Sequence, residues 1–315
     1  MGRAATIIRV TARILDGKAV AQQIYEEIAA GVAARVARGL SRPRLATVVV
    51  GDDPGSAQYV RMKQTNAKQV GIDSDDHRLP ANTTTEQLLE LVDRLNRDQR
   101  VSGILVQQPP PPHIDMTRVI LALDPAKDVD GAHPLNAGLV ALGFDGGVEP
   151  CTPAGIILLL ERAGIPIEGA NAVVVGRSNL VGKPTALLLL RRNATVTLCH
   201  TRTRDLASHT RNADILVAAA GKANLITREM VKPGAAVIDV GTNMVDGKQV
   251  GDLGPGVAEV AGWLTPNPGG VGPMTRAMLI KNTFDAEVRR SGEQPDRSPP
   301  VRWGPRASAR EATTP

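Results

Sequence analysis

The sequence predicts an α/β protein with two α/β domains, a doubly wound parallel sheet in the second domain, and a ligand cleft between the domains. From residue 14 onwards, short β-branched apolar runs alternate with helical segments, which is the pattern of parallel βαβ units. The alternation begins again at residue 151, and 315 residues are enough for two domains of ordinary size. We therefore expect a first domain at 14–150 and a second at 151–272.

The first domain is expected to hold two buried strands and four helices. The strands are predicted at 45–50 and 103–106, where short apolar runs are closed by Gly51 and by the prolines that begin at residue 109. Apolar residues at helical spacing predict four helices, at 17–38, 56–70, 85–96 and 117–123.

The second domain is expected to begin at Cys151 with a helix that has Thr152 as its N-cap and Pro153 at its first position and runs to Arg162. Asp246-Gly247 predicts the turn of a hairpin over 244–250, whose edges are suited to pairing with a second subunit. A last helix is expected at 274–290. Short apolar runs predict four strands, at 172–175, 195–199, 214–218 and 236–240.

The net charge of +5 arises entirely from the two ends of the chain. Residues 1–13 carry +3 and residues 286–315 carry +2, so the body between them is neutral. We expect 1–13 to be an N-terminal extension and 291–315 to be a disordered tail, because the tail is rich in Pro, Ser, Gly and Arg. A neutral body with only 2% aromatic residues argues against a nucleic-acid partner.

Cysteine and histidine usage limits the other classes of partner. Cys151 and Cys199 are too few for a disulfide framework, and the five histidines lack the close spacing of metal ligands, so no metal is expected. No apolar stretch has the length of a membrane span, and no signal peptide is visible. We expect a cytoplasmic protein without a membrane partner.

A glycine-rich turn follows the strand at 172–175 and opens a helix, the context of a dinucleotide-binding loop. Gly176 permits the tight turn, Arg177 and Ser178 follow it, and Gly182 lies at the start of the helix, where backbone N–H groups can hold a phosphate. The spacing departs from G-x-G-x-x-G, and a turn that binds no ligand is the alternative.

The end of the next strand favours NADP over NAD. An NAD site usually has an acid there to bond the ribose hydroxyls, but Thr201 and Arg202 come first and no acid precedes Asp205. Together with Arg177 they are suited to a 2′-phosphate. The alternative is a solvated rim of arginines.

Tyr59 and Lys63 are four residues apart on one helical face, and Gln107 ends the strand at 103–106. A lysine in a cleft can transfer protons if desolvation brings its pKa towards neutrality, and a glutamine can orient it by a hydrogen bond. The alternatives are a surface lysine beside a core tyrosine, and a polar strand end.

Two loops are suited to a flat ligand. Asp128 and Asp130 lie in one loop that lacks the ligand series of a calcium site, and one of the two carboxylates can accept a pair of hydrogen bonds from a heterocycle edge. The segment 266–273 is too rich in glycine for a core element, and its bare backbone allows close approach.

Taken together, the segments resemble one family, the bifunctional methylenetetrahydrofolate dehydrogenase/cyclohydrolases. The resemblance spans about 14–285, and eight blocks in the same order carry it. These blocks are Asp16-Gly-Lys, Ser56-Ala-Gln-Tyr-Val-Arg-Met-Lys63, Val106-Gln107, Lys127-Asp-Val-Asp-Gly131, Pro150-Cys-Thr-Pro153, Gly176-Arg-Ser-Asn-Leu-Val-Gly-Lys-Pro184, Cys199-His-Thr-Arg-Thr203 and Pro268-Gly-Gly-Val-Gly-Pro-Met-Thr275.

The resemblance implies NADP-linked oxidation of 5,10-methylenetetrahydrofolate to 5,10-methenyltetrahydrofolate, followed by hydrolysis to 10-formyltetrahydrofolate. It implies that Lys63 is catalytic with Gln107 as its partner, that Tyr59 packs on the folate, and that Asp130 anchors the pterin. It also implies a Rossmann-like NADP domain, a final helix that returns to the first domain, and a homodimer through the nucleotide domain. Further substrate contacts are implied for Val106, Pro268, Gly269 and Gly270, and cofactor contacts for Gly176, Arg177, Ser178, Thr201, Arg202 and Thr242.

This chain departs from the family pattern around the cleft. Gln108 and Pro110 replace apolar residues, Thr242 stands where isoleucine is common, and Asn267 replaces the usual valine. Three other functions stay open: a dehydrogenase without the hydrolase, an NADP dehydrogenase for another small substrate, and a non-catalytic nucleotide-binding protein.

Overall fold

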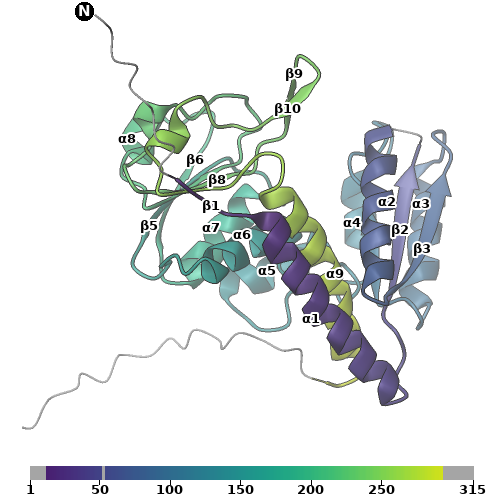
Figure 1. Cartoon of the computed structure of the whole chain (residues 1–315). Helices are drawn as coiled ribbons and strands as arrows, with labels where there is room; N and C mark the ends of the chain where they lie inside the picture. The colour runs from purple at the N-terminus through teal and green to yellow at the C-terminus, as the bar shows by residue number, and fades with distance from the viewer. Residues whose placement is uncertain (1–11, 52–53, 294–315) are drawn as a thin grey trace, which may run out of the picture.

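The computed structural model describes residues 12–51 and 54–293, without the side chains of 54–59. Within these ranges the chain forms two parallel sheets with a layer of long helices between them (Figure 1). The predicted α/β class, with two domains and a parallel sheet in the second, is confirmed. The expectations for residues 1–11 and for the tail from residue 294 lie outside the described residues.

The smaller sheet has three parallel strands in the order β3-β2-β4. They are β2 (Arg44–Val50), β3 (Asp73–Leu79) and β4 (Gly103–Val106), and the helices around them are α2 (Pro54–Gln69), α3 (Thr85–Arg97) and α4 (Met116–Ala122). Strands β2 and β4 were predicted because their apolar side chains are buried on both faces.

Strand β3 was not predicted, because its sequence is acidic and has no apolar run. It is an edge strand that pairs only with β2, so most of its side chains keep contact with water. Arg44 of β2 bonds Asp75 at 3.0 Å and Asp73 at 3.3 Å, which offsets the acidic charge of the strand.

The larger sheet has six parallel strands in the order β1-β11-β8-β7-β5-β6. The four predicted strands are present as β5 (Asn171–Val175), β6 (Thr195–Cys199), β7 (Ile215–Ala218) and β8 (Ala236–Asp239). All neighbours pair in parallel, so the carboxyl ends of these strands meet at one edge of the sheet. The nucleotide loop follows β5 at this edge.

The start of the predicted first domain needs a correction. Residues 13–14 form strand β1 (Arg13–Ile14), which pairs with β11 (Trp263–Leu264) and so belongs to the larger sheet. Backbone N–H groups of Arg13 and Leu15 donate to Gly262 and Leu264 at 2.8 Å each. Two-residue strands carry no periodicity in the sequence, which is why neither was predicted.

Long helices fill the space between the two sheets (Figure 1). They are α1 (Gly17–Ala37), α6 (Cys151–Arg162) and α9 (Val271–Arg290), and their buried apolar residues, among them Ile24, Leu160 and Leu279, belong to one core cluster. A Cβ on Gly155 of α6 would lie 2.9 Å from the Met274 Cβ of α9, so glycine lets these helices approach closely. Among the described residues, no helix combines the length and apolar character that crossing a membrane requires.

Two helix starts differ from the predictions. Helix α6 begins at Cys151 with Pro150 as its N-cap, so Thr152 lies inside the helix, where its hydroxyl bonds that of Thr275 at 2.9 Å. Helix α9 begins at Val271, three residues before the predicted start. Neither helix has a side-chain hydrogen bond at its N-cap.

The remaining elements surround the larger sheet. The predicted hairpin is confirmed: β9 (Asn243–Val245) and β10 (Lys248–Val250) are antiparallel, with Asp246 and Gly247 at positive φ, and the hairpin projects from the lobe (Figure 1). The other helices are α5 (Pro134–Leu142), α7 (Gly182–Arg191), α8 (Leu206–Thr210) and the short 3₁₀ turns Arg228–Met230 and Val257–Glu259.

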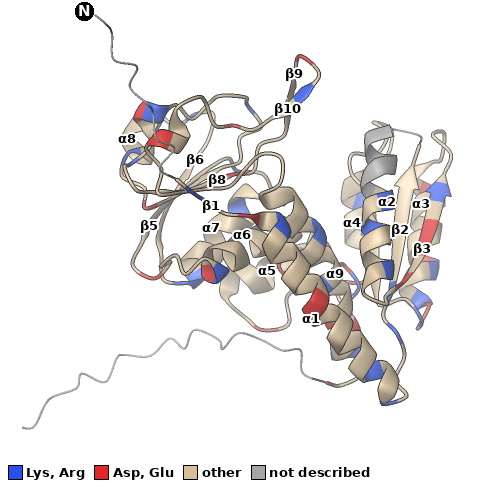
Figure 2. Ribbon diagram, in the orientation of Figure 1, with Lys and Arg blue, Asp and Glu red and all other residues tan. Residues whose placement is uncertain are grey.

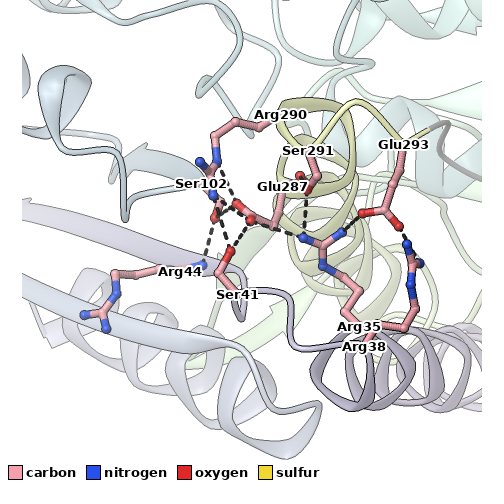
Figure 3. A network of polar contacts seen from close by, with 9 residues as sticks. All are labelled: Arg35, Arg38, Ser41, Arg44, Ser102, Glu287, Arg290, Ser291 and Glu293. Atoms are coloured by element: carbon pink, nitrogen blue, oxygen red, sulfur yellow. Dashed lines mark hydrogen bonds and ion pairs between the residues drawn. The ribbon is translucent and has the colours of Figure 1, made fainter.

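Lys, Arg, Asp and Glu are interspersed over the helices (Figure 2). One network of polar contacts joins α1, α9 and the smaller sheet (Figure 3). Its centre is the Glu287 side chain, which is 1% exposed and pairs with Arg35 at 3.3 Å and Arg290 at 2.6 Å. The hydroxyls of Ser41 and Ser102 donate to the same carboxylate at 2.7 and 2.8 Å. Burial acts to raise the pKa of Glu287, but hydrogen bonds from Arg290, Ser41 and Ser102 outweigh it, and the net pKa is lowered.

Replacing Glu287 with glutamine is expected to lower the free energy of unfolding by about 3 kcal/mol, because the buried Arg35 and its neighbour Arg290 lose the carboxylate that both contact. Arg35 keeps its ion pair with the partly exposed Glu293, which limits the loss. Urea denaturation measures this change. The control is Glu86→Gln, which breaks the exposed ion pair with Arg118 and is expected to leave the urea midpoint almost unchanged. Equal midpoints for both variants would contradict a central role for Glu287.

Candidate active site

A cleft of about 740 Å³ opens between the smaller sheet and the carboxyl edge of the larger one. One wall is formed by α2 and the segment after β4, and the other by the segment after β8 and the glycine-rich segment before α9. Eight predicted site residues line it: Lys63, Val106, Gln107, Asp130, Thr242, Pro268, Gly269 and Gly270.

Lys63 and Gln107 meet in this cleft as predicted. The Lys63 Nζ donates to the Gln107 Oε1 at 3.0 Å, and the Gln107 Nε2 donates to the Gln108 carbonyl at 2.6 Å. The second bond fixes the glutamine amide so that its oxygen faces the lysine. Burial lowers the pKa of Lys63 below its ordinary value, and Asp130 opposes this by Coulomb attraction. The site therefore holds an amine that loses its proton more readily than an exposed lysine.

Asp130 faces the same cavity from the loop after α4. Desolvation raises the pKa of its carboxyl, Lys63 acts to lower it, and the neighbouring Asp128 acts to raise it. The Asp128 side chain is itself buried and accepts hydrogen bonds from the Asn136 amide at 2.9 Å and the His133 N–H at 2.7 Å. These hydrogen bonds hold the loop that carries Asp130, whose carboxyl oxygens can accept hydrogen bonds in the cleft.

Cys151 lies beside Asp130 at the start of α6 and is 2% exposed. Its thiol donates to the Val129 carbonyl at 3.2 Å, and burial raises its pKa well above the ordinary value. A neutral thiol is a poor nucleophile, so the site does not present Cys151 as one.

The glycine-rich wall is held against the start of α1. Asp16 caps α1 by accepting from the N–H groups of Lys18 at 2.9 Å and Ala19 at 3.1 Å. A Cβ on Gly17 would lie 1.7 Å from the Gly270 carbonyl oxygen, so only glycine fits between helix and wall. This packing brings Lys18 to the edge of the cleft.

The predicted nucleotide loop is a close-packed turn between β5 and α7. Gly176 has φ of 129°, and a Cβ there would lie 2.0 Å from the Ala219 carbonyl oxygen. A Cβ on Gly182 would lie 2.0 Å from the Gly176 carbonyl oxygen, and the Gly182 N–H donates to the Ser178 hydroxyl at 3.2 Å. Both glycines are therefore required by close backbone approach. The first N–H groups of α7, those of Gly182 and Lys183, are bonded to Ser178 within the turn.

Arg177, Ser178, Thr201 and Arg202 are exposed in the turns after β5 and β6. They are outside the lining of the large cleft, but lie at the same edge of the sheet. Asp205 is the N-cap of α8 and accepts from the Ser208 N–H at 3.3 Å, so its carboxylate serves the helix. Arg177 and Arg202 form no ion pair within the part of the chain that the structure describes, which suits them to a phosphate.

Sequence reasoning missed several cleft residues and left one prediction open. Lys18, Thr152 and Arg276 line the cleft. Lys18 and Thr152 lie within the sequence blocks that resemble the family, and Arg276 directly follows the last block, so the resemblance could have indicated all three. Nothing local in the hairpin sequence indicates that Gln249 reaches the cleft. The side chain of Tyr59 lies outside the described residues, although its helix position one turn before Lys63 is confirmed.

Comparison with known proteins identifies the family. The family model "Tetrahydrofolate dehydrogenase/cyclohydrolase, catalytic domain" matches residues 15–130, and the model of the NAD(P)-binding domain of the same family matches residues 150–291. Proteins named "Bifunctional protein FolD" from Paraburkholderia phytofirmans and Moorella thermoacetica are each 55% identical to this chain. Their alignments cover 89% and 88% of this chain and 98% and 99% of the relatives.

Solved structures extend the comparison to the fold. The bifunctional FolD of Campylobacter jejuni superposes with a TM-score of 0.87 at 43% identity, over 89% of this chain and 99% of its own. The FolD of Trypanosoma brucei, solved with NADP and an inhibitor, gives a TM-score of 0.84 at 40% identity, over 89% of this chain and 98% of its own. On these matches, the chain belongs to the tetrahydrofolate dehydrogenase/cyclohydrolase family.

Proposed function

We propose that this protein oxidises 5,10-methylenetetrahydrofolate with NADP to 5,10-methenyltetrahydrofolate and hydrolyses this product to 10-formyltetrahydrofolate. The observation that carries the proposal is the Lys63 amine, which burial makes easier to deprotonate and which bonds Gln107 in a cleft shared with Asp130. Family membership supplies the substrate class.

For the oxidation, the residues of the cleft have to hold the folate against the cofactor. Hydride leaves the methylene carbon, the folate becomes a delocalised cation, and NADP supplies the hydride acceptor when it is bound. Asp130 is assigned to the pterin edge, Val106 and the Pro268–Gly270 backbone to its flat face, and Tyr59 to packing on the ring. A neutral Lys63 does not repel the cation that forms.

For the hydrolysis, Lys63 acts as the base. It takes a proton from water as the water oxygen bonds to the methenyl carbon, and the remaining hydroxyl proton passes to N5 as the bond from carbon to N5 breaks. Gln107 accepts an N–H of the lysine, which leaves the nitrogen lone pair free for the cleft. One proton is released overall, as the conversion of a cation to a neutral formyl compound requires.

The cofactor is NADP. Gly176, Arg177 and Ser178, in the turn after β5, are assigned to its phosphates. Thr201 and Arg202 are assigned to the 2′-phosphate, and Thr242 to the nicotinamide end that reaches the cleft. The two required glycines and the two arginines without a described ion pair fit such an anionic ligand.

Replacing Arg202 with alanine is expected to lower kcat/KM for NADP about tenfold or more, because a charge-assisted hydrogen bond to the 2′-phosphate is lost. Steady-state rates with NADP and with NAD measure the effect, and the NAD rate is expected to change little. Arg211→Ala, at an exposed arginine of the same lobe, is the control. An equal fall with both cofactors would contradict a contact to the 2′-phosphate.

The direct test of the function is an absorbance assay with purified protein. Methenyltetrahydrofolate is expected to form from methylenetetrahydrofolate and NADP, and then to decay faster than it does spontaneously. Formation without accelerated decay would favour the second candidate, a dehydrogenase alone. Absence of both would contradict the function.

The remaining assignments concern the organisation of the protein. We assign the folate lobe to the chain from the start of α1 to residue 150, completed by the final helix 274–290, and the cofactor lobe to 151–272. Packing of α9 on α1 supports the return of the final helix to the folate lobe, and α9 also packs on α6 of the cofactor lobe. A homodimer through the cofactor lobe is supported by exposed Met244 and Val245 on the projecting hairpin, and a monomer in sedimentation equilibrium would contradict it.

Two buried free thiols support a reducing, cytoplasmic location.

A further inference from the structure

We infer that Asn267 is a positioning residue for hydride transfer, because its side chain ties the loop assigned to the nicotinamide end to the wall assigned to the folate. This inference rests on the proposed function. It concerns a residue at which the family pattern has valine, a side chain that can form neither of the hydrogen bonds described next.

Asn267 joins three segments that are separate in the sequence. Its Nδ2 donates to the Gly241 carbonyl at 2.6 Å, in the loop after β8. Its Oδ1 accepts from the Gln249 Nε2 at 2.9 Å, on hairpin strand β10. Asn267 itself directly precedes the Pro268–Gly270 wall, and all three residues line the cleft.

The stem of the loop after β8 is held by other contacts. The buried Asp239 carboxylate accepts from the N–H groups of Gly241 at 3.1 Å and Asp252 at 2.9 Å. Asp252 in turn accepts from the Asn243 amide at 3.0 Å. These contacts hold the base of the loop independently of Asn267. Asn267 holds the Gly241 carbonyl, which directly precedes Thr242.

The glycine-rich segment of the same wall is likewise anchored at its far end. The Gly270 N–H donates to the Pro266 carbonyl at 2.8 Å, and the Gly270 carbonyl packs against Gly17 of α1. This wall of the cleft thus consists of two separately anchored segments, and Asn267 is a cross-link between them. Its loss is expected to let the two segments shift relative to each other without unfolding either one.

The two reactions depend on this cross-link to different extents. Hydride transfer needs the nicotinamide and the folate carbon aligned, and an error of about 1 Å can cost about 100-fold in rate. Hydrolysis of methenyltetrahydrofolate needs Lys63, Gln107 and water, on the other side of the cleft. A positioning role therefore predicts selective loss of the dehydrogenase.

The test compares both activities in Asn267→Ala. The dehydrogenase kcat is expected to fall about tenfold or more, while hydrolysis of added methenyltetrahydrofolate stays within about twofold of wild type. With substrate deuterated at the methylene carbon, the isotope effect on kcat is expected to rise, because the hydride step becomes limiting. Asn267→Asp keeps the acceptor for Gln249 but loses the donor to Gly241, and is expected to behave like Asn267→Ala.

Two further variants separate the halves of the cross-link. Gln249→Ala removes only the hairpin bond and is expected to lower the dehydrogenase less than Asn267→Ala does. Lys248→Ala, on the neighbouring exposed residue of the same strand, is the control and is expected to leave both activities unchanged.

An unchanged dehydrogenase in Asn267→Ala, or an equal fall in both activities, would overturn the inference. Inactive wild-type protein would overturn the proposed function and this inference with it, whereas active wild type beside an unaffected variant overturns only the inference.

Discussion

Replacing Lys63 with methionine is expected to lower the rate of methenyltetrahydrofolate hydrolysis by about 100-fold or more, while folate still binds. The amine is the one group that the proposal assigns to proton transfer, and general base catalysis contributes about 10²–10⁴ in rate. Methionine fills a similar volume without a proton acceptor. Stopped-flow decay of methenyltetrahydrofolate measures the rate, and equilibrium titration with a folate analogue measures binding.

Two controls separate this loss from damage to the fold. Lys68→Met, on the exposed face of the same helix, is expected to keep wild-type hydrolysis. Burial lowers the pKa of Lys63, so folding disfavours the charged form of this side chain. Between that lowered pKa and the ordinary 10.5, the unfolded chain therefore binds more protons than the folded chain does. Stability therefore rises with pH in this window, and Lys63→Met, which removes the penalty, is expected to melt no lower than wild type. An unchanged hydrolysis rate would refute the role of Lys63.

The same pKa shift predicts the pH profile of the hydrolysis. The rate is expected to rise with pH as Lys63 loses its proton, with a midpoint below the ordinary lysine value of 10.5. Spontaneous hydrolysis, measured in parallel, is subtracted. Lys63→Met is expected to lack this rise.

Replacing Asp130 with alanine is expected to raise the KM for folate about 10- to 100-fold, because hydrogen bonds to a charged acceptor contribute about 1.5–3 kcal/mol. The dissociation constant of NADP is expected to stay unchanged, since the turns assigned to the cofactor phosphates follow β5 and β6 of the larger sheet. Fluorescence titration with NADP and steady-state kinetics with folate measure the two. A parallel loss of both affinities would indicate a folding defect and contradict a specific folate contact.

Asp130 also acts electrostatically on Lys63, and the Asp130→Ala variant tests this effect through the pH profile of the hydrolysis. Its carboxylate acts to raise the pKa of Lys63. Its removal is therefore expected to move the midpoint of the hydrolysis profile to lower pH, measured at saturating methenyltetrahydrofolate. A shift to higher pH would mean that the two groups do not interact as the structure indicates.

Most elements of the fold were predictable where burial leaves a local pattern. Strands β2, β4, β5, β7 and β8 are short apolar runs because helices cover both faces of a parallel sheet. The acidic strand β3 and the two-residue strands β1 and β11 lack such a pattern, because pairing with a neighbour alone makes them strands. The start of α6 was predicted two residues late, because Thr152 bonds Thr275 of another helix and does not cap its own.

The candidate site divides in the same way. Lys63, Gln107, Asp130 and the glycines at 176 and 269 were found from residue type, spacing and family resemblance. Gln249 was not predicted, because nothing in the sequence of the hairpin indicates that this side chain reaches the cleft and bonds Asn267. The arginine-rich end of β6 indicated a phosphate site, and the capping role of Asp205 became visible only in the structure.

By itself, the sequence determined the α/β class, the two-domain organisation and the residues able to do the chemistry, because apolar periodicity and residue type act over a few neighbouring positions. The tertiary structure decided which of these residues meet. Lys63 and Gln107 lie 44 positions apart and come within 3.0 Å because α2 follows β2, the strand beside β4. Desolvation of the amine and the cross-link through Asn267 likewise depend on segments distant in the chain, and such contacts exist only once the whole core has packed.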